Sequence, residues 1–285
     1  MMPAGATCKK KKWKDAIVYN GMGLFNLFIG VLIVFPLIYA LFSSFKSASD
    51  MSTYPPKLFP SVWTTENYSS VFKLAPIFRY MLNSAIVSIS GTLLRLTTAS
   101  LAAFSFAFYE FRGKKLLFFL ILGTMMIPGE AVLVANYMNV SRAGLMDTYI
   151  GMTIVYAVSA SGIFIIRQHM RTLPTALHDA ALIDGCSDIR FLLAIVLPCS
   201  TPVLYTVGIS SVVNLWNAYL WPLMITNKQY MRTVQVGITM LSDTDNPAYH
   251  MEMAGTCFIL IPSILVFLLF QRKIVSGITT GAVKS

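Results

Sequence analysis

The sequence predicts an all-α integral membrane protein with six transmembrane helices and both chain ends on the inner side of the membrane. Three observations lead to this prediction. The chain has 285 residues, of which 56% are hydrophobic and only 12% are charged, about half the charged share of a soluble domain. Six apolar stretches are long enough to cross about 30 Å of hydrocarbon. The positive charges fall mainly on one side of the resulting layout.

The six predicted spans comprise residues 22–41, 84–108, 116–136, 149–167, 202–221 and 254–270. Each must be a helix, because a backbone in lipid has to satisfy its own hydrogen bonds. The first apolar stretch is too long for a signal peptide, and no small-x-small cleavage site follows it, so a retained span is expected. Residues 1–16 then form a basic cytoplasmic tail, and residues 17–285 form a single transmembrane domain.

The Lys and Arg residues favour an orientation with both ends inside. Fourteen of the 22 lie in the tail, in the connections after the second and fourth spans, and at the C-terminus. Seven lie in the other three connections, and Arg95 lies within the second span. This two-to-one bias is the one that the positive-inside rule predicts. The lysines of the tail are expected to face anionic lipid, since no basic domain that suits nucleic acid is present.

The three histidines and four cysteines show no spacing typical of a metal site or a disulfide framework. We therefore expect no metal and no cofactor.

The segment 173–187, between the fourth and fifth spans, carries helix start and stop signals. Thr172 is a candidate N-cap with Pro174 in the first turn, Gly185 is a candidate left-handed stop, and Ser187 is expected to cap the next helix. His178 is expected to be exposed. Helical spacing predicts one shared face for four residues of the segment, which are Leu177, Ala180, Ala181 and Asp184. The pattern fits either a rigid helix seated in a groove of another protein or a helix lying in the lipid interface.

The residues from Asp179 to Cys186, followed by an apolar run and Leu197-Pro198, resemble the EAA signature of permease subunits of binding-protein-dependent ABC importers. Asp179 stands where the family usually has Glu, and Cys186 stands where Ala is usual. Where relatives often carry a second proline in the third span, this chain has Ala135 or Asn136. The resemblance covers nearly the whole chain. The chain is similar to the smaller six-span permease of the maltose, oligosaccharide and glycerol-3-phosphate type. The stretches that carry this similarity are residues 54–60, 83–84, 102–104, 111–113, 127–128, 216–223 and 277–284.

The resemblance implies a non-catalytic permease subunit of an ATP-driven importer for a sugar, a polyol or glycerol-3-phosphate, in the inner membrane of a bacterial cell. It implies three kinds of partner: a second permease, two ATP-binding subunits and an extracytoplasmic solute-binding protein. The chain has no Gly-x-x-x-x-Gly-Lys-Ser/Thr loop, so ATP hydrolysis is expected on a separate subunit. The segment 173–187 is then a coupling helix with six coupling residues, which are Asp179, Ala180, Ala181, Asp184, Gly185 and Cys186.

Five residues in or near the spans are candidates for the translocation path: Arg95, Glu130, Asn214, Trp216 and Asn217. A charge near the middle of a span costs roughly 2.5–3.5 kcal/mol, so Arg95 is expected to face protein or a wet cavity. Arg95 could pair with Glu130 or with the second permease, or it could contact an anionic substrate. The aromatic ring and amides of the other three residues suit a sugar, although interface packing is the more common explanation for such residues.

Two other functions stay open at this point. A stand-alone secondary transporter would need inverted repeats and carboxylates at the membrane midplane, and Glu130 is the only acidic residue in a predicted span. A membrane scaffold without transport activity would not need a capped helix between two spans. An ATPase that co-purifies with the chain would favour the importer over both.

Overall fold

The computed structural model describes residues 5–241 and 248–282, with side chains from residue 23 to residue 265 and at residue 268. The side chains of the predicted basic tail lie outside this description. Within the described residues the chain is helical, with no strand. The described residues form two compact units. The first unit comprises those within Met1–Val71 and Ser242–Phe258, and the second comprises those within Phe72–Leu241 and Ile259–Ser285.

The first unit begins with the long helix α1 (Gly5–Ser43). Its segment Gly23–Ser43 has a mean hydropathy of 2.5 and contains nearly all of the predicted span 22–41. Large apolar side chains along it, such as Phe25 and Phe28, are exposed. A helix with this many exposed apolar side chains needs lipid or another protein around it.

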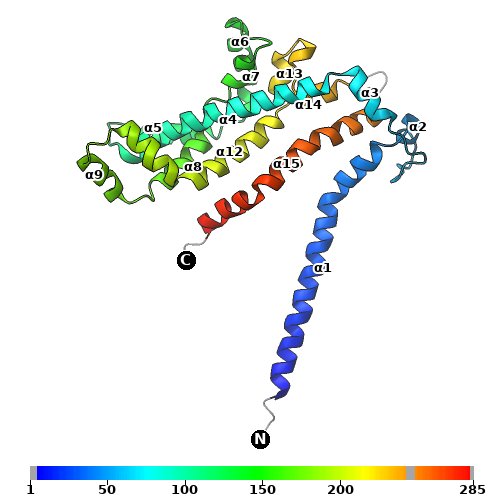
Figure 1. Cartoon of the computed structure of the whole chain (residues 1–285), viewed down its shortest axis with the longest axis horizontal. Coiled ribbons are helices and arrows are strands. Elements are labelled where there is room, and N and C mark those ends of the chain that lie inside the picture. Colours follow the sequence, from blue (N-terminus) through cyan, green and yellow to red (C-terminus); the bar gives the residue numbers. More distant parts are fainter. Residues whose placement is uncertain (1–4, 242–247, 283–285) are drawn as a thin grey trace. The chain divides into compact units, whose positions relative to one another are not determined.

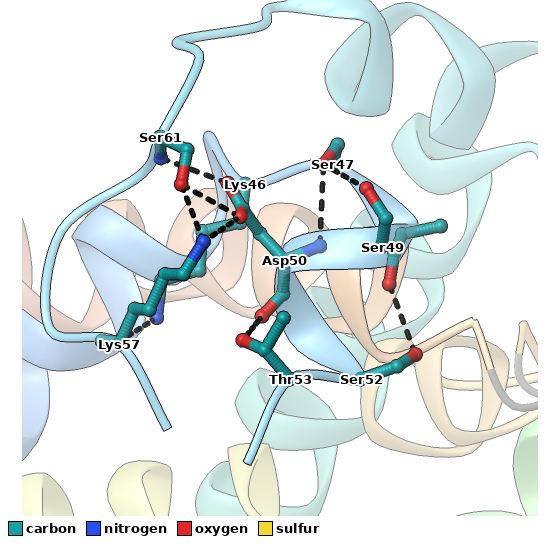
Figure 2. Close-up of polar contacts among 9 residues, drawn as sticks. Lys46, Ser47, Ser49, Asp50, Ser52, Thr53, Lys57 and Ser61 are labelled. Atoms are coloured by element: carbon teal, nitrogen blue, oxygen red, sulfur yellow. Dashed lines mark hydrogen bonds and ion pairs between the residues drawn. The ribbon is translucent and has the colours of Figure 1, made fainter. Parts of the chain in front are cut away.

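The connection after α1 is held by a polar network around Asp50, in the short helix α2 (Ala48–Met51) (Figure 2). The Asp50 carboxylate accepts hydrogen bonds from Lys57 Nζ at 3.0 Å, from the Ser61 amide at 2.8 Å and from Ser61 Oγ at 2.9 Å. These bonds, the one from Lys57 first, lower the pKa of Asp50 to about 2. Ser47 Oγ accepts from the Asp50 amide and caps α2. The network closes residues 47–61 into an ordered loop.

Asn67, in helix α3 (Glu66–Leu74), fastens this loop to the end of α1. Its buried side-chain amide donates to the backbone oxygens of Ser44 and Lys46, both at 2.8 Å. A buried amide with two backbone partners fixes the direction in which the chain leaves α1.

The second unit is built on α4 (Ile77–Phe108), which contains the predicted span 84–108. The helices α8 (Ala160–Met170) and α12 (Thr201–Trp216) pack along α4, and α5 (Lys114–Thr124) packs on α8 (Figure 1). Ala99 and Ala103 of α4 are fully buried. Small residues at these positions allow the helix backbones to approach closely, as is typical of helix packing in membranes.

The prediction of one continuous helix over residues 116–136 is wrong. The helix α5 ends at Thr124, and a 3-10 turn (Gly129–Val132) leads into α6 (Leu133–Arg142), which is bent by 95° from α5. Pro128 explains the break, because it has no N–H to donate and it disfavours helical backbone at the residue before it.

The prediction of one continuous helix over residues 149–167 is also wrong. The chain forms α7 (Tyr149–Ile154) and then, after an interruption, α8. The backbone carbonyls of Tyr156 and Ala157 in the interruption accept hydrogen bonds from two α4 side chains, Arg95 Nε at 3.2 Å and Thr98 Oγ1. Side-chain donors from α4 thus replace the helical donors, which a backbone at membrane depth requires.

The fifth predicted span, 202–221, ends early. The helix α12 stops at Trp216, and a separate short helix α13 (Leu220–Ile225) follows. Before α12 the chain forms α10 (Asp188–Phe191), a π-helical segment (Leu192–Val196) and α11 (Leu197–Cys199), which together are bent by 80° from α12. After α13 come a 3-10 turn (Gln229–Met231) and α14 (Val234–Thr239).

The predicted span 254–270 lies within α15 (Tyr249–Ala282). Among the described residues, Gly23–Ser43 of α1 and the whole of α4 are each long and apolar enough to cross a membrane. Two bent pairs, Lys114–Thr124 with Gly129–Arg142 and Asp188–Cys199 with Thr201–Trp216, raise this number to four if each pair counts as one span.

Candidate functional site

The segment 173–187 contains one short helix, α9 (Thr175–Ile183), near the Phe108 end of α4 (Figure 1). The predicted N-cap, Thr172, is wrong. Pro174 occupies the cap position with an extended backbone, and the Thr172 hydroxyl instead donates to the carbonyl of His169 at 2.7 Å. Because proline fixes its own φ and lacks an N–H, the helix starts two residues later than the threonine signal suggested.

The predicted stop at Gly185 is confirmed. Gly185 has φ +67°, in the left-handed region. The Cys186 amide donates to the Ala181 carbonyl at 2.9 Å, and the Gly185 amide donates to the Leu182 carbonyl at 3.1 Å. These two bonds form a Schellman motif, which satisfies the last carbonyls of α9 and fixes the direction of the chain beyond it.

The four residues predicted to share one face of the segment do not all point outward. Ala181 is only 6% exposed and packs into the core of the second unit, near Leu173 and Cys186. Beyond its first two residues, which are also exposed, α9 and its C-cap expose Leu177, Asp179, Ala180, Leu182, Ile183 and Asp184. We call these six residues the exposed α9 face. Ile183, at 87% exposure, is the most prominent apolar side chain on it.

His178 is half-buried, contrary to the expectation that it is exposed. Its ring lies 5.7 Å from that of Phe108 and 5.1 Å from that of Phe191, between centroids. The residue therefore joins α9 to the end of α4 and to α10 through ring packing.

A polar contact strengthens this junction. The carboxylate of Asp188, at the start of α10, acts on the hydroxyl of Tyr109, which follows α4, and this interaction is the main reason that the pKa of Tyr109 rises to about 12. Ser187 occupies the predicted N-cap position of α10, but its hydroxyl forms no capping hydrogen bond. The ring contacts of His178 thus connect α9 to the end of α4 and to α10, and Tyr109 and Asp188 add a polar contact between the latter two helices.

Three helix interruptions meet at a cleft of about 510 Å³. The 3-10 turn at Gly129, the α7–α8 interruption and the α12–α13 interruption all contribute to its walls. Glu130 is exposed and lines the cleft, together with polar and aromatic residues that include Asn136, Tyr156, Tyr219 and Trp221.

Arg95 supports one wall of this cleft. Its Nε donates to the carbonyl of Tyr156, and its guanidinium carbon lies 5.8 Å from the centroid of the Tyr156 ring. In the described chain it forms no ion pair with Glu130. The interruption between α7 and α8 leaves the Tyr156 carbonyl without a backbone donor from its own helix. Arg95 supplies a donor to this carbonyl in its place.

The other three predicted path residues lie on α12 and at its end. Trp216 and Asn217 line a separate, mostly apolar pocket of about 380 Å³, with Pro262 of α15 on another wall. Asn217 Oδ1 accepts from Gln235 Nε2 at 3.2 Å, and Asn214 is exposed. The structure therefore does not bring the five predicted residues into one site.

Tyr156 is the cleft residue that sequence reasoning missed. It lies within an apolar stretch with no proline or glycine beside it, so no local signal marks it. Only its three-dimensional contact with Arg95, 61 positions earlier, identifies it.

Residues 95–280 match the family model described as the binding-protein-dependent transport system inner membrane component. The chain belongs to this family. This permease is 31% identical over 264 residues to the arabinooligosaccharides transport system permease protein AraQ of Bacillus subtilis, covering 92% of this chain and 94% of that relative. It is 33% identical over 261 residues to the sn-glycerol-3-phosphate transport system permease protein UgpE of Yersinia pestis, covering 88% and 93%.

The permease also matches a solved fold. A crystal structure of a bacterial ABC transporter involved in the import of the acidic polysaccharide alginate contains a chain that aligns with a TM-score of 0.74 at 19% identity, over 95% of this chain and 99% of that one. These findings confirm the ABC permease resemblance and favour it over a stand-alone secondary transporter. The chain is a non-catalytic membrane subunit of the sugar-importer type, in a family whose ATPase is a separate subunit.

Proposed function

We propose that this permease crosses the inner membrane six times with both ends in the cytoplasm, and that it forms the path of an ATP-driven importer together with a second permease. The charge bias of the sequence supports the orientation. Residues 1–16 are then the cytoplasmic tail and residues 17–285 one transmembrane domain. The broken third, fourth and fifth spans fit transporters, in which irregular backbone occurs where it lines a cavity.

The proposed cargo is a neutral sugar or polyol, delivered by an extracytoplasmic solute-binding protein. The cleft offers the surfaces that sugars bind, namely aromatic rings for stacking and polar groups for hydroxyls, such as Tyr219 and Asn136. Glu130 would repel an anionic cargo at this cleft. Arg95 already donates to the carbonyl of Tyr156, so its guanidinium is less available to bind a phosphate.

The exposed α9 face is the proposed docking site of the ATPase. The apolar and acidic side chains on this face are the observation on which the proposed function rests. Leu182 and Ile183 are exposed large apolar side chains, and burial of one such side chain contributes about 1.5–3 kcal/mol. Asp179 and Asp184 give the same face a negative charge. A helix that lies on anionic lipid is typically rich in Lys and Arg, so a protein groove suits this face better than lipid does.

The junction around His178 would transmit the motion of the ATPase. Closure of two ATP-binding subunits would displace α9, and the contacts of His178, Phe108 and Phe191 would carry the end of α4 and α10 with it. Such a rigid-body movement would shift the helices whose interruptions form the cleft, and it would alternate the access of the path.

Ile183→Glu tests this proposal, because it places a charge in the centre of the apolar patch and leaves the junction intact. We expect the Kd of the ATP-binding subunits for the variant to rise about tenfold or more, since losing one buried apolar side chain costs about 1.5 kcal/mol or more. Co-purification from detergent at a series of protein concentrations measures the change.

The matched control is Leu58→Glu, which alters an exposed apolar residue in the loop between α1 and α3. This control should retain the ATP-binding subunits. If Ile183→Glu retained these subunits as well as the control does, the proposed docking site would be contradicted.

A further inference from the structure

A second cleft, of about 780 Å³, lies between the start of α5 and the end of α8. These helices pack against each other (Figure 1). Four cations line the cleft, Lys114, Lys115, Arg167 and Arg171, against one carboxylate, Glu110. The net charge of the lining is strongly positive. Its residues belong neither to the segment 173–187 nor to the cleft of about 510 Å³.

Two of the cations are held in place by this chain. Lys114 Nζ donates to Glu110 Oε1 at 2.8 Å and to the Tyr109 carbonyl at 2.7 Å. Arg167 Nε donates to the Phe106 carbonyl at 3.2 Å, and its guanidinium carbon lies 4.0 Å from the centroid of the Phe118 ring. These contacts make a rigid floor for the cleft.

The other two cations, Lys115 and Arg171, are exposed, and their side chains form no hydrogen bond or ion pair with the residues that the structure describes. They lie on opposite helices, one at the start of α5 and the other directly after α8. Gly113 precedes α5 and offers no side-chain cap, so first-turn amides of α5 add donors for an anion.

Apolar side chains continue the same cleft along α5. Leu116 and Phe119 are 63% and 72% exposed, and Leu122 lies one turn further on. A free inorganic ion would have no use for this apolar wall. A ligand with a negative head and a hydrocarbon tail would occupy both parts.

We propose that this cleft binds an anionic phospholipid, with its phosphate between Lys115 and Arg171 and an acyl chain along Leu116 and Phe119. Basic pockets between transmembrane helices are a known setting for anionic headgroups. The lipid would belong to the cytoplasmic leaflet if the orientation proposed above holds. The proposal that the cleft binds an anionic lipid does not depend on that orientation. Lipid held here would brace α5 against α8, two helices that flank the junction with α9.

Lipid titration of the purified full-length chain, with the subunits that co-purify, tests the proposal. Native mass spectrometry would count bound dioleoyl phosphatidylglycerol and dioleoyl phosphatidylcholine. We expect phosphatidylglycerol to bind more tightly, and the variant Lys115→Gln/Arg171→Gln to lose this preference by about tenfold or more, since each cation near a lipid phosphate contributes about fivefold. Both substitutions leave the Lys114 and Arg167 contacts in place.

The matched control is Arg112→Gln/Arg190→Gln, which removes two exposed cations that do not line the cleft. It should bind phosphatidylglycerol as the unmodified chain does. An equal loss in both variants would show diffuse charge attraction and overturn the site. Competition by millimolar inorganic phosphate would show a free-anion site and would overturn the lipid assignment. The titration needs no transport, so failure of the proposed import function would leave its result readable.

Discussion

Replacing Gly185 with valine is expected to yield a transporter that assembles but no longer couples ATP hydrolysis to uptake. The backbone of Gly185 has φ +67°, a conformation that costs an ordinary residue roughly 1–2 kcal/mol and a β-branched residue more. Valine would therefore open the Schellman motif and change the direction of the chain at Asp184 and Cys186. These residues lie at the end of the proposed docking site of the ATPase. Uptake into proteoliposomes and ATPase stimulation by the loaded binding protein measure the loss.

Two further variants separate coupling from general destabilisation. Gly185→Asn should keep most of the activity, because asparagine tolerates left-handed backbone better than other residues with a Cβ. Gly144→Val carries the same backbone penalty, with φ +70°, in the turn after α6, and it should lower stability without uncoupling. Full coupling in Gly185→Val, or equal uncoupling in Gly144→Val, would argue against the role of the α9 stop.

Gly151→Ala is expected to lower the stability of the fold strongly. An added Cβ at Gly151 would lie 2.2 Å from the backbone oxygen of Leu145, and a backbone atom cannot rotate away as a side chain can. The Gly151 carbonyl also accepts from the buried Nε1 of Trp221 at 3.2 Å. We expect the free energy of unfolding to fall by about 1–3 kcal/mol or more. The cleft of about 510 Å³ should also be distorted, because Trp221 lines it.

Thermal unfolding of the detergent-solubilised protein measures this loss. Gly123→Ala is the control, because no atom lies within 4 Å of an added Cβ in the helix α5, and alanine is favoured over glycine in a helix. A melting temperature for Gly151→Ala equal to that of the control would show that α7 does not approach the Leu145 turn this closely.

Hydropathy was enough to locate the apolar stretches, but it could not show where their helices break. The break before Gly129 could have been anticipated from Pro128. The break after Ile154 could not, because residues 155–159 include no proline or glycine. It is stabilised by Arg95 and Thr98, which supply donors to its carbonyls from another helix. Such breaks are tertiary features that a single stretch of sequence does not encode.

The candidate site likewise has features that the sequence predicts and features that only the structure shows. The stop at Gly185 was predictable, because left-handed backbone has a strong local residue preference. The inward direction of Ala181 and the burial of His178 depend on Phe108 and Phe191, which lie in other helices. Helical spacing shows which residues share a face but does not show which face the protein covers. For Arg95, the charge in an apolar stretch predicted a protein contact, while its actual partner, a carbonyl, required the structure.

A photo-crosslinking amino acid at position 183 would show whether the exposed α9 face docks on an ATP-binding subunit, as we propose. Ile183 is 87% exposed, so the probe disturbs no internal packing. With the transporter assembled in its membrane, we expect a covalent adduct with the ATP-binding subunit, and the yield of this adduct should change when ATP is added. An adduct with lipid alone, in the presence of that subunit, would contradict the proposal.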